Sequence, residues 1–128
     1  MNQAIYIPPE TPQQAVEEFY REKRGSAPSI HEALQYLEEE MIELAYELYC
    51  YDCHEFLSEE GEQDDESVAK ELADVMFTLY GVAIAADIDL DKAFRLVVES
   101  NMTKQKTPDG KVQKGESYIE PDMSGALL

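Results

Sequence analysis

Basic residues are scarce in this sequence. Its 128 residues include 10 Lys and Arg against 28 Asp and Glu, which gives a formal net charge of -18 at pH 7. Such a charge repels the phosphates of nucleic acids and the anionic surface of a membrane. The sequence also lacks any apolar run of the roughly 18 residues that a transmembrane helix requires. We therefore expect no nucleic-acid partner and no membrane partner.

The beginning of the chain lacks the features of a secretory signal. Residues 1–14 contain neither a basic start nor an apolar run. This absence argues against export, and it predicts a cytoplasmic protein whose thiols are reduced.

Cysteine and histidine are represented by two residues each. Cys50, Cys53 and His54 form the string C-x-x-C-H, which is typical of c-type haem attachment. Haem attachment of that kind goes with export, and a zinc site would need a second pair of ligands. We predict neither group here, and the role of these three residues stays open.

What the sequence does contain is a composition typical of a folded protein, with 44% hydrophobic and 30% charged residues. Its length fits one domain, residues 1–128. Four segments show helical signals, at about 11–23, 29–57, 67–86 and 89–101. Thr11 and Ser29 each open a capping box, and either Asp87 or Asp89 can cap the fourth helix. The sequence therefore predicts an all-α fold.

The composition of the later segments predicts how the helices are arranged and where regular structure ends. Residues 58–66 have no apolar side chain and contain Gly61, so they predict an exposed turn between two antiparallel helices. The helix at 67–86 is apolar on nearly every side, which predicts burial on most of its faces. From about residue 102 glycines and prolines interrupt regular structure and four lysines are concentrated, which predicts an irregular C-terminal tail.

Carboxylates recur at helical spacing on the second and third predicted helices. Glu39, Glu40 and Glu43 follow the pattern E-E-x-x-E, and Glu71 and Asp74 are three residues apart. Glutamates on a long amphipathic helix are usually a solvated face, and acidic residues also suit a helix N-terminus. Glu71 and Asp74, however, occupy the one polar strip of an otherwise apolar helix, where a compensating charge is needed. Oxygen ligands select hard cations, so we predict Mg²⁺, with Mn²⁺ as an alternative.

These residues resemble a known family. The runs Leu37-Glu-Glu-Glu-Met-Ile-Glu-Leu44 and Glu71-Leu-Ala-Asp74 are similar to the MazG-like all-α nucleoside triphosphate pyrophosphohydrolases, including phage and bacterial members likened to phosphoribosyl-ATP pyrophosphohydrolases. The resemblance implies a four-helix MazG-like bundle assembled as a homodimer or as a dimer of dimers, a homotetramer. It also implies that Glu40, Glu43, Glu71 and Asp74 bind metal, and that Glu39 binds a further ion or directs the attacking water.

The resemblance continues into the tail, through Ser100-Asn-Met-Thr-Lys104 and the run from Asp109 to Tyr118. It implies phosphate contacts from the following residues: Asn101, Lys104, Lys111, Lys114 and Tyr118. The expected activity is the hydrolysis of a nucleoside triphosphate, such as a deoxynucleotide, to monophosphate and pyrophosphate. Phosphoribosyl-ATP as substrate and a non-catalytic helical interaction module are the alternatives. Phe19 and Tyr20 could stack on a base, although aromatic residues at such positions are more often core.

Overall fold

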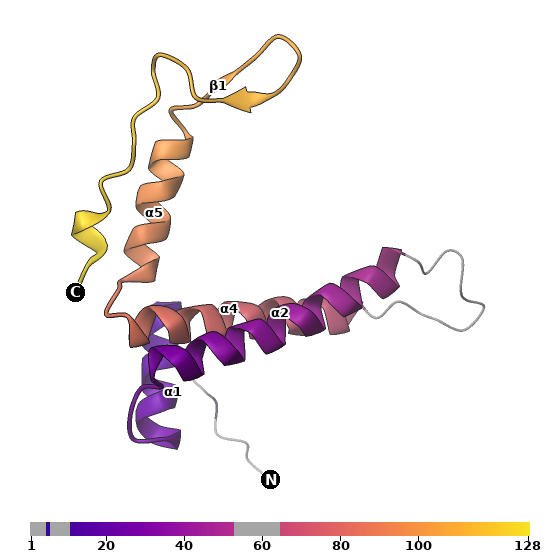
Figure 1. The fold of residues 1–128 in the computed structure, drawn as a ribbon, viewed down its shortest axis with the longest axis vertical. Coiled ribbons are helices and arrows are strands. Elements are labelled where there is room, and N and C mark those ends of the chain that lie inside the picture. Colours follow the sequence, from indigo (N-terminus) through magenta and orange to yellow (C-terminus); the bar gives the residue numbers. More distant parts are fainter. Residues whose placement is uncertain (1–4, 6–10, 53–64) are drawn as a thin grey trace.

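Two long antiparallel helices form the main layer of the structure (Figure 1). The computed structural model describes residue 5 and residues 11–52 and 65–128. Helix α2 spans Ile30–Asp52 and helix α4 spans Asp65–Ala85, and the two lie side by side. The prediction of antiparallel neighbours is confirmed. Residues 53–57 of the predicted second helix, and the predicted turn up to residue 64, lie outside the described residues.

Helix α1, Pro12–Lys23, crosses the C-terminal half of α4 and forms the small core with it. Val16, Tyr20 and Tyr80 are the buried members of this core. The contact depends on Gly81, because a Cβ atom at that position would lie 3.0 Å from the Tyr20 hydroxyl oxygen. A glycine therefore lets α1 approach α4 at this point.

The predicted helix starts are present. The Thr11 side chain accepts from the backbone N–H of Gln14, and the Gln14 side chain accepts from the Thr11 N–H, which completes the first capping box. Ser29 and Glu32 form the second box at the start of α2, with donor–acceptor distances of 3.1 and 3.3 Å. Each box satisfies backbone N–H groups that have no partner within the helix. Local sequence alone thus fixes where these two helices begin.

Helix α5, Leu90–Asn101, points away from the α2–α4 layer (Figure 1). Of the two candidate caps, Asp89 is the one used, and its side chain accepts from the backbone N–H of Lys92. Asp91 holds the base of the helix in place, because it accepts a hydrogen bond of 2.5 Å from the Tyr80 hydroxyl. The all-α prediction is confirmed, with four helices among the described residues.

The C-terminal tail is more ordered than the prediction of an irregular segment implied. Strands β1, Gln105–Lys106, and β2, Val112–Gln113, pair as a short antiparallel hairpin, and a 3-10 helix η1 follows at Met123–Ala126. The tail then returns along α5, where Asp89 donates its N–H to the Ala126 carbonyl at 2.8 Å. The tight turn relies on Gly110, whose φ of 87° suits glycine.

One face of α4 stays exposed in the single chain, so this helix is covered less completely than its all-round apolar pattern suggests. Leu72, Met76 and Leu79 are 52%, 49% and 42% exposed. Only α1 and α2 make extensive contacts with α4 in the described part of the chain, and they leave these three side chains exposed. A helix that is apolar on all sides can therefore have a face that its own chain does not cover.

Candidate metal centre

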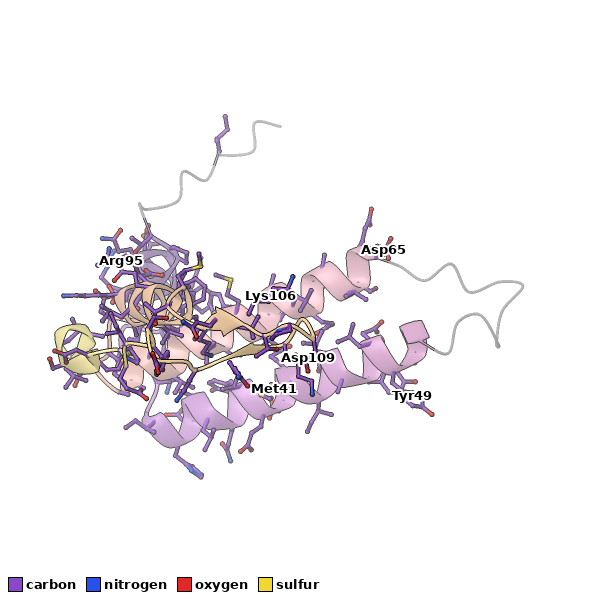
Figure 2. The ribbon with its side chains drawn as sticks, turned by 90° about the horizontal axis from the view of Figure 1, so that it is seen from above. Met41, Tyr49, Asp65, Arg95, Lys106 and Asp109 are labelled. Carbon is purple, nitrogen blue, oxygen red and sulfur yellow. The ribbon has the colours of Figure 1, made fainter. Side chains whose placement is uncertain are left out.

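Three carboxylates meet between α2 and α4. Glu40 and Glu43 project from α2 one turn apart, and Glu71 comes from the first half of α4. One carboxylate oxygen of each lies within 4.8 Å of the others. In Figure 2, α2 is marked by Met41 and Tyr49 and the start of α4 by Asp65, and the two helices run side by side there. A single chain thus brings these three carboxylates together, and no second subunit is needed for them to meet.

The buried oxygens of this cluster lack partners. Among the described residues, two buried side-chain atoms form no hydrogen bond, and they are the Oε2 atoms of Glu40 and Glu71. Burial raises the pKa of the Glu40 carboxyl group, and the negative charges of Glu43, Asp74 and Glu71 raise it further. An unpartnered carboxylate oxygen away from water is costly. A bound cation would remove that cost, so the donor set fits a hard divalent ion.

Asp74 lies beside the cluster but is held by a basic side chain. Its Oδ2 atom is 2.7 Å from the Lys70 Nζ atom, which also lies 3.7 Å from the Glu71 Oε1 atom. The negative charge of Asp74 is one of the causes that raise the pKa of the Glu40 carboxyl group. Sequence reasoning missed Lys70, although its spacing of four residues from Asp74 is typical of an ion pair on a helix. Lys70 therefore supplies positive charge at the edge of the cluster.

Glu39 lies outside the cluster. It is exposed on α2, next to Glu40 in sequence, and it is not one of the three residues whose oxygens converge. Successive helical residues are about 100° apart, so two adjacent glutamates cannot face the same point. The structure thus separates Glu39 from Glu40, which the E-E-x-x-E pattern alone could not do.

The predicted phosphate-binding residues of the tail are grouped together but lie apart from the carboxylates. In Figure 1 the hairpin follows the C-terminal end of α5, and this is the end of α5 that lies farther from the α2–α4 layer. Within the tail, the Lys114 ammonium lies 4.7 Å from the centre of the Tyr118 ring and 3.3 Å from a Glu120 oxygen. Lys111 lies 3.9 Å from Asp109, and Lys104 donates its backbone N–H to the Asn101 carbonyl. These residues form a second, basic group.

The two aromatic residues of α1 have different environments. Tyr20 is buried, as expected of a core residue, whereas Phe19 is 44% exposed. The Phe19 ring packs edge-on against Phe77 of α4, with 5.0 Å between ring centres. Both rings line an open cleft of about 530 Å³ between α1 and α4. The prediction of a core position is thus confirmed for Tyr20 and wrong for Phe19.

Comparison with known proteins gives one match. Residues 9–101 match the family model described as phosphoribosyl-ATP pyrophosphohydrolase. The chain belongs to this family. It is therefore a member of the MazG-like all-α superfamily of pyrophosphohydrolases, as the resemblance indicated. A search of curated proteins found no match.

The carboxylate cluster lies within the part of the chain that matches the family model. Glu39, Glu40, Glu43, Glu71 and Asp74 all lie within the matched residues, whereas the tail beyond residue 101 lies outside them. MazG-like pyrophosphohydrolases typically depend on a divalent metal, and the cluster offers suitable ligands. Separately, no helix in the described part of the chain is both long and apolar enough to cross a membrane.

Proposed function

We propose that this chain hydrolyses a nucleoside triphosphate to the monophosphate and pyrophosphate, with Mg²⁺ or Mn²⁺ bound at the carboxylate cluster. The observation that carries the proposal is the pair of buried, unpartnered oxygens on Glu40 and Glu71, within reach of Glu43. All-oxygen ligands favour these ions, which usually bind through carboxylates together with substrate phosphates. The family supplies the class of reaction, the release of pyrophosphate.

The reaction breaks one phosphoanhydride bond. A water oxygen bonds to the α-phosphorus, the bond from that phosphorus to the bridging oxygen breaks, and pyrophosphate leaves with that oxygen. A divalent ion, when bound, neutralises charge on the phosphates and acidifies the water. Glu40, Glu43 and Glu71 are the proposed ligands, and Asp74 is a further ligand once Lys70 gives up its ion pair. Glu39 is our proposed acceptor of the water proton.

The tail completes the proposed substrate site. Asn101, Lys104, Lys111, Lys114 and Tyr118 would bind the phosphates, through ammonium groups and hydrogen-bond donors. Lysines suit this role because the substrate is strongly anionic and the chain as a whole carries a net charge of -18.

The test is a panel of nucleoside and deoxynucleoside triphosphates, incubated with the purified protein and Mg²⁺ or Mn²⁺. We expect pyrophosphate from at least one of them. Glu40→Gln should lose most of the activity, and the matched control Glu38→Gln, an exposed glutamate on the same helix, should keep it. Absence of pyrophosphate from the entire panel would refute the activity, and full activity in Glu40→Gln would refute the ligand assignment.

A second candidate substrate is phosphoribosyl-ATP, which the family match favours. It carries the same triphosphate, so the carboxylate cluster serves both substrates and does not distinguish them. Measuring kcat/KM for phosphoribosyl-ATP beside the nucleotide panel decides between them. The non-catalytic alternative, a helical interaction module, predicts no heat on titration with Mn²⁺ and no thermal stabilisation by it.

A further inference from the structure

Two hydroxyl groups at the C-terminal end of α5 bind the backbone of a residue much later in the tail. The Ser100 hydroxyl donates to the Ile119 carbonyl oxygen at 2.6 Å, and the Ile119 N–H donates to the Thr103 hydroxyl oxygen at 2.9 Å. These bonds join residues that are 19 and 16 positions apart in the sequence. Both backbone polar groups of Ile119 are therefore bound by side chains, and we call the three residues the hydroxyl clamp.

The hydroxyl clamp is a connected and partly buried network. Ser100 is 6% exposed, and its carbonyl oxygen accepts from the Thr103 hydroxyl at 2.6 Å and from the Thr103 N–H at 3.0 Å. The Thr103 hydroxyl thus donates one hydrogen bond and accepts another, which uses its single hydrogen. The Ser117 hydroxyl adds a bond of 3.1 Å to the Thr103 carbonyl oxygen. Since a polar group that loses its partner away from water costs free energy, the network favours one geometry of these chain segments.

The clamp closes a loop, residues 104–118, that contains most of the proposed phosphate-binding residues. Four of the five lie in this closed loop, and they are Lys104, Lys111, Lys114 and Tyr118. The fifth, Asn101, lies between the two clamp hydroxyls in the sequence. A loop whose two ends are joined has fewer conformations than a free tail, so it loses less conformational entropy when its residues bind a ligand.

The hairpin inside the closed loop is ordered by separate contacts. Strands β1 and β2 pair through residues 105–106 and 112–113, and the Thr107 N–H donates to the Lys111 carbonyl oxygen at 2.7 Å. None of these bonds involves a residue of α5. The hydroxyl clamp supplies that attachment, because it joins the chain that leaves β2 to the end of α5. Loss of the clamp should therefore free the loop from the helix and leave the hairpin itself paired.

We propose that Ser100 and Thr103 are positioning residues for the phosphates of the substrate. Their hydroxyls hold the closed loop in place on α5 before a ligand arrives, so that its lysines and Tyr118 act as one preformed site. Neither hydroxyl contacts a phosphate in this arrangement, because both already bind the protein backbone. The phosphate-binding role of the loop rests on the proposed function, whereas its closure rests on the hydrogen bonds of the clamp.

A set of matched variants tests the clamp. Thr103→Val removes the hydroxyl and nearly keeps the size of the side chain, whereas Thr103→Ser keeps the hydroxyl. Ser100→Ala removes the second hydroxyl. Ser124→Ala is the control, because the Ser124 hydroxyl donates to Asp122 at 2.7 Å, outside the closed loop.

Hydrogen exchange followed by NMR measures the closure without any substrate. In Thr103→Val the amide of Ile119 should exchange about tenfold faster than in the wild type, as expected for the loss of one hydrogen bond. Thr103→Ser should restore the slow exchange. Unchanged exchange of the α4 amides would separate opening of the loop from unfolding of the whole domain. Equal exchange of the Ile119 amide in all variants would overturn the clamp.

Binding of inorganic tripolyphosphate in the presence of Mg²⁺, measured by calorimetry, tests the positioning role without catalysis. Thr103→Val and Ser100→Ala should each raise its Kd by about tenfold, because the loop must then be ordered on binding. Thr103→Ser and Ser124→Ala should bind it like the wild type. Faster exchange of the Ile119 amide together with an unchanged Kd would refute the positioning role.

Steady-state kinetics on any nucleotide that is hydrolysed give a third readout. The two variants that lack a clamp hydroxyl should raise KM by about tenfold and change kcat by less than about threefold, because the loop binds the phosphates in the ground state and in the transition state alike. A lower kcat at unchanged KM would contradict the proposal. A tripolyphosphate affinity that depends on the clamp, in a protein that hydrolyses none of the nucleotides, would support the positioning role and count against the proposed function.

Discussion

Replacing Glu40 by glutamine should make the metal-free protein more stable. Its carboxylate lies near three others, and its pKa is raised by burial and by their charges. Two unit charges 4 Å apart repel by about 1 kcal/mol in water and by about 4 kcal/mol at an effective dielectric constant of about 20. Solvent and the neighbouring Lys70 reduce this repulsion. We therefore expect a net gain of about 1 kcal/mol, which corresponds to a rise in Tm of about 4 °C for a domain of this size.

The same substitution should weaken the response to metal. Mn²⁺ at one hundred times its Kd stabilises a folded protein by about 2.7 kcal/mol, which would raise the Tm of the wild type by roughly 10 °C. Glu40→Gln removes one of the three proposed ligands, so its Tm should rise much less. The order of stability of the two proteins then reverses between metal-free and metal-saturated samples.

Differential scanning fluorimetry in EDTA and in Mn²⁺ measures both effects. Glu38→Gln is the matched control, because it removes the same charge from an exposed position of α2. That control should change neither the Tm in EDTA nor the shift caused by Mn²⁺. A metal-free Tm of Glu40→Gln that is no higher than that of the wild type would contradict this prediction, and so would an equal response of both variants to Mn²⁺.

Three further predictions concern the fold that supports the site. Gly81→Ala should destabilise the protein by about 1 to 3 kcal/mol, because the added methyl group meets the buried Tyr20 hydroxyl, and Tyr20→Phe in the same chain should recover part of the loss in chemical denaturation. Tyr80→Phe should cost about 1 to 3 kcal/mol by the same assay, since it removes the hydrogen bond to Asp91; an unchanged stability would show that this bond is not needed. Hydrogen bonds from the Arg24 side chain and from the backbone at Ser29 lower the pKa of Glu32, so its carboxylate stabilises the fold above its unfolded pKa of about 4.5. Glu32→Gln should therefore be less stable than the wild type at pH 7, and this difference should vanish as the pH falls through the lowered pKa; a difference independent of pH would contradict the assignment.

Helix starts illustrate what local sequence can determine. The capping boxes at Thr11 and Ser29 were predictable because their hydrogen bonds join residues three apart, whatever the rest of the chain does. The choice between Asp87 and Asp89 was open, since both can cap a helix. The structure resolves it: Asp87 has a positive φ of 56°, and Asp89 provides the cap.

The candidate site depends on tertiary packing that local sequence patterns do not determine. Periodicity placed Glu39, Glu40 and Glu43 on one helix but could not say which of them face α4, because that depends on how α2 is rotated against its neighbour. Packing selects Glu40 and Glu43 to meet Glu71 and leaves Glu39 exposed. Periodicity could not predict the distance between the tail lysines and the cluster either, because that distance depends on the direction of α5.

The sequence by itself determined the all-α class, the helix starts, the acidic character and, through its motif, the family. These properties are encoded in spacing within a few residues and in overall composition. Tertiary structure alone decided that three of the five carboxylates converge, that Lys70 pairs with Asp74, and that apolar faces of α4 and α5 stay exposed in a single chain. Such features depend on the rotation and direction of whole helices. Those are set by contacts between distant residues, such as Tyr20 on Gly81 and Tyr80 with Asp91.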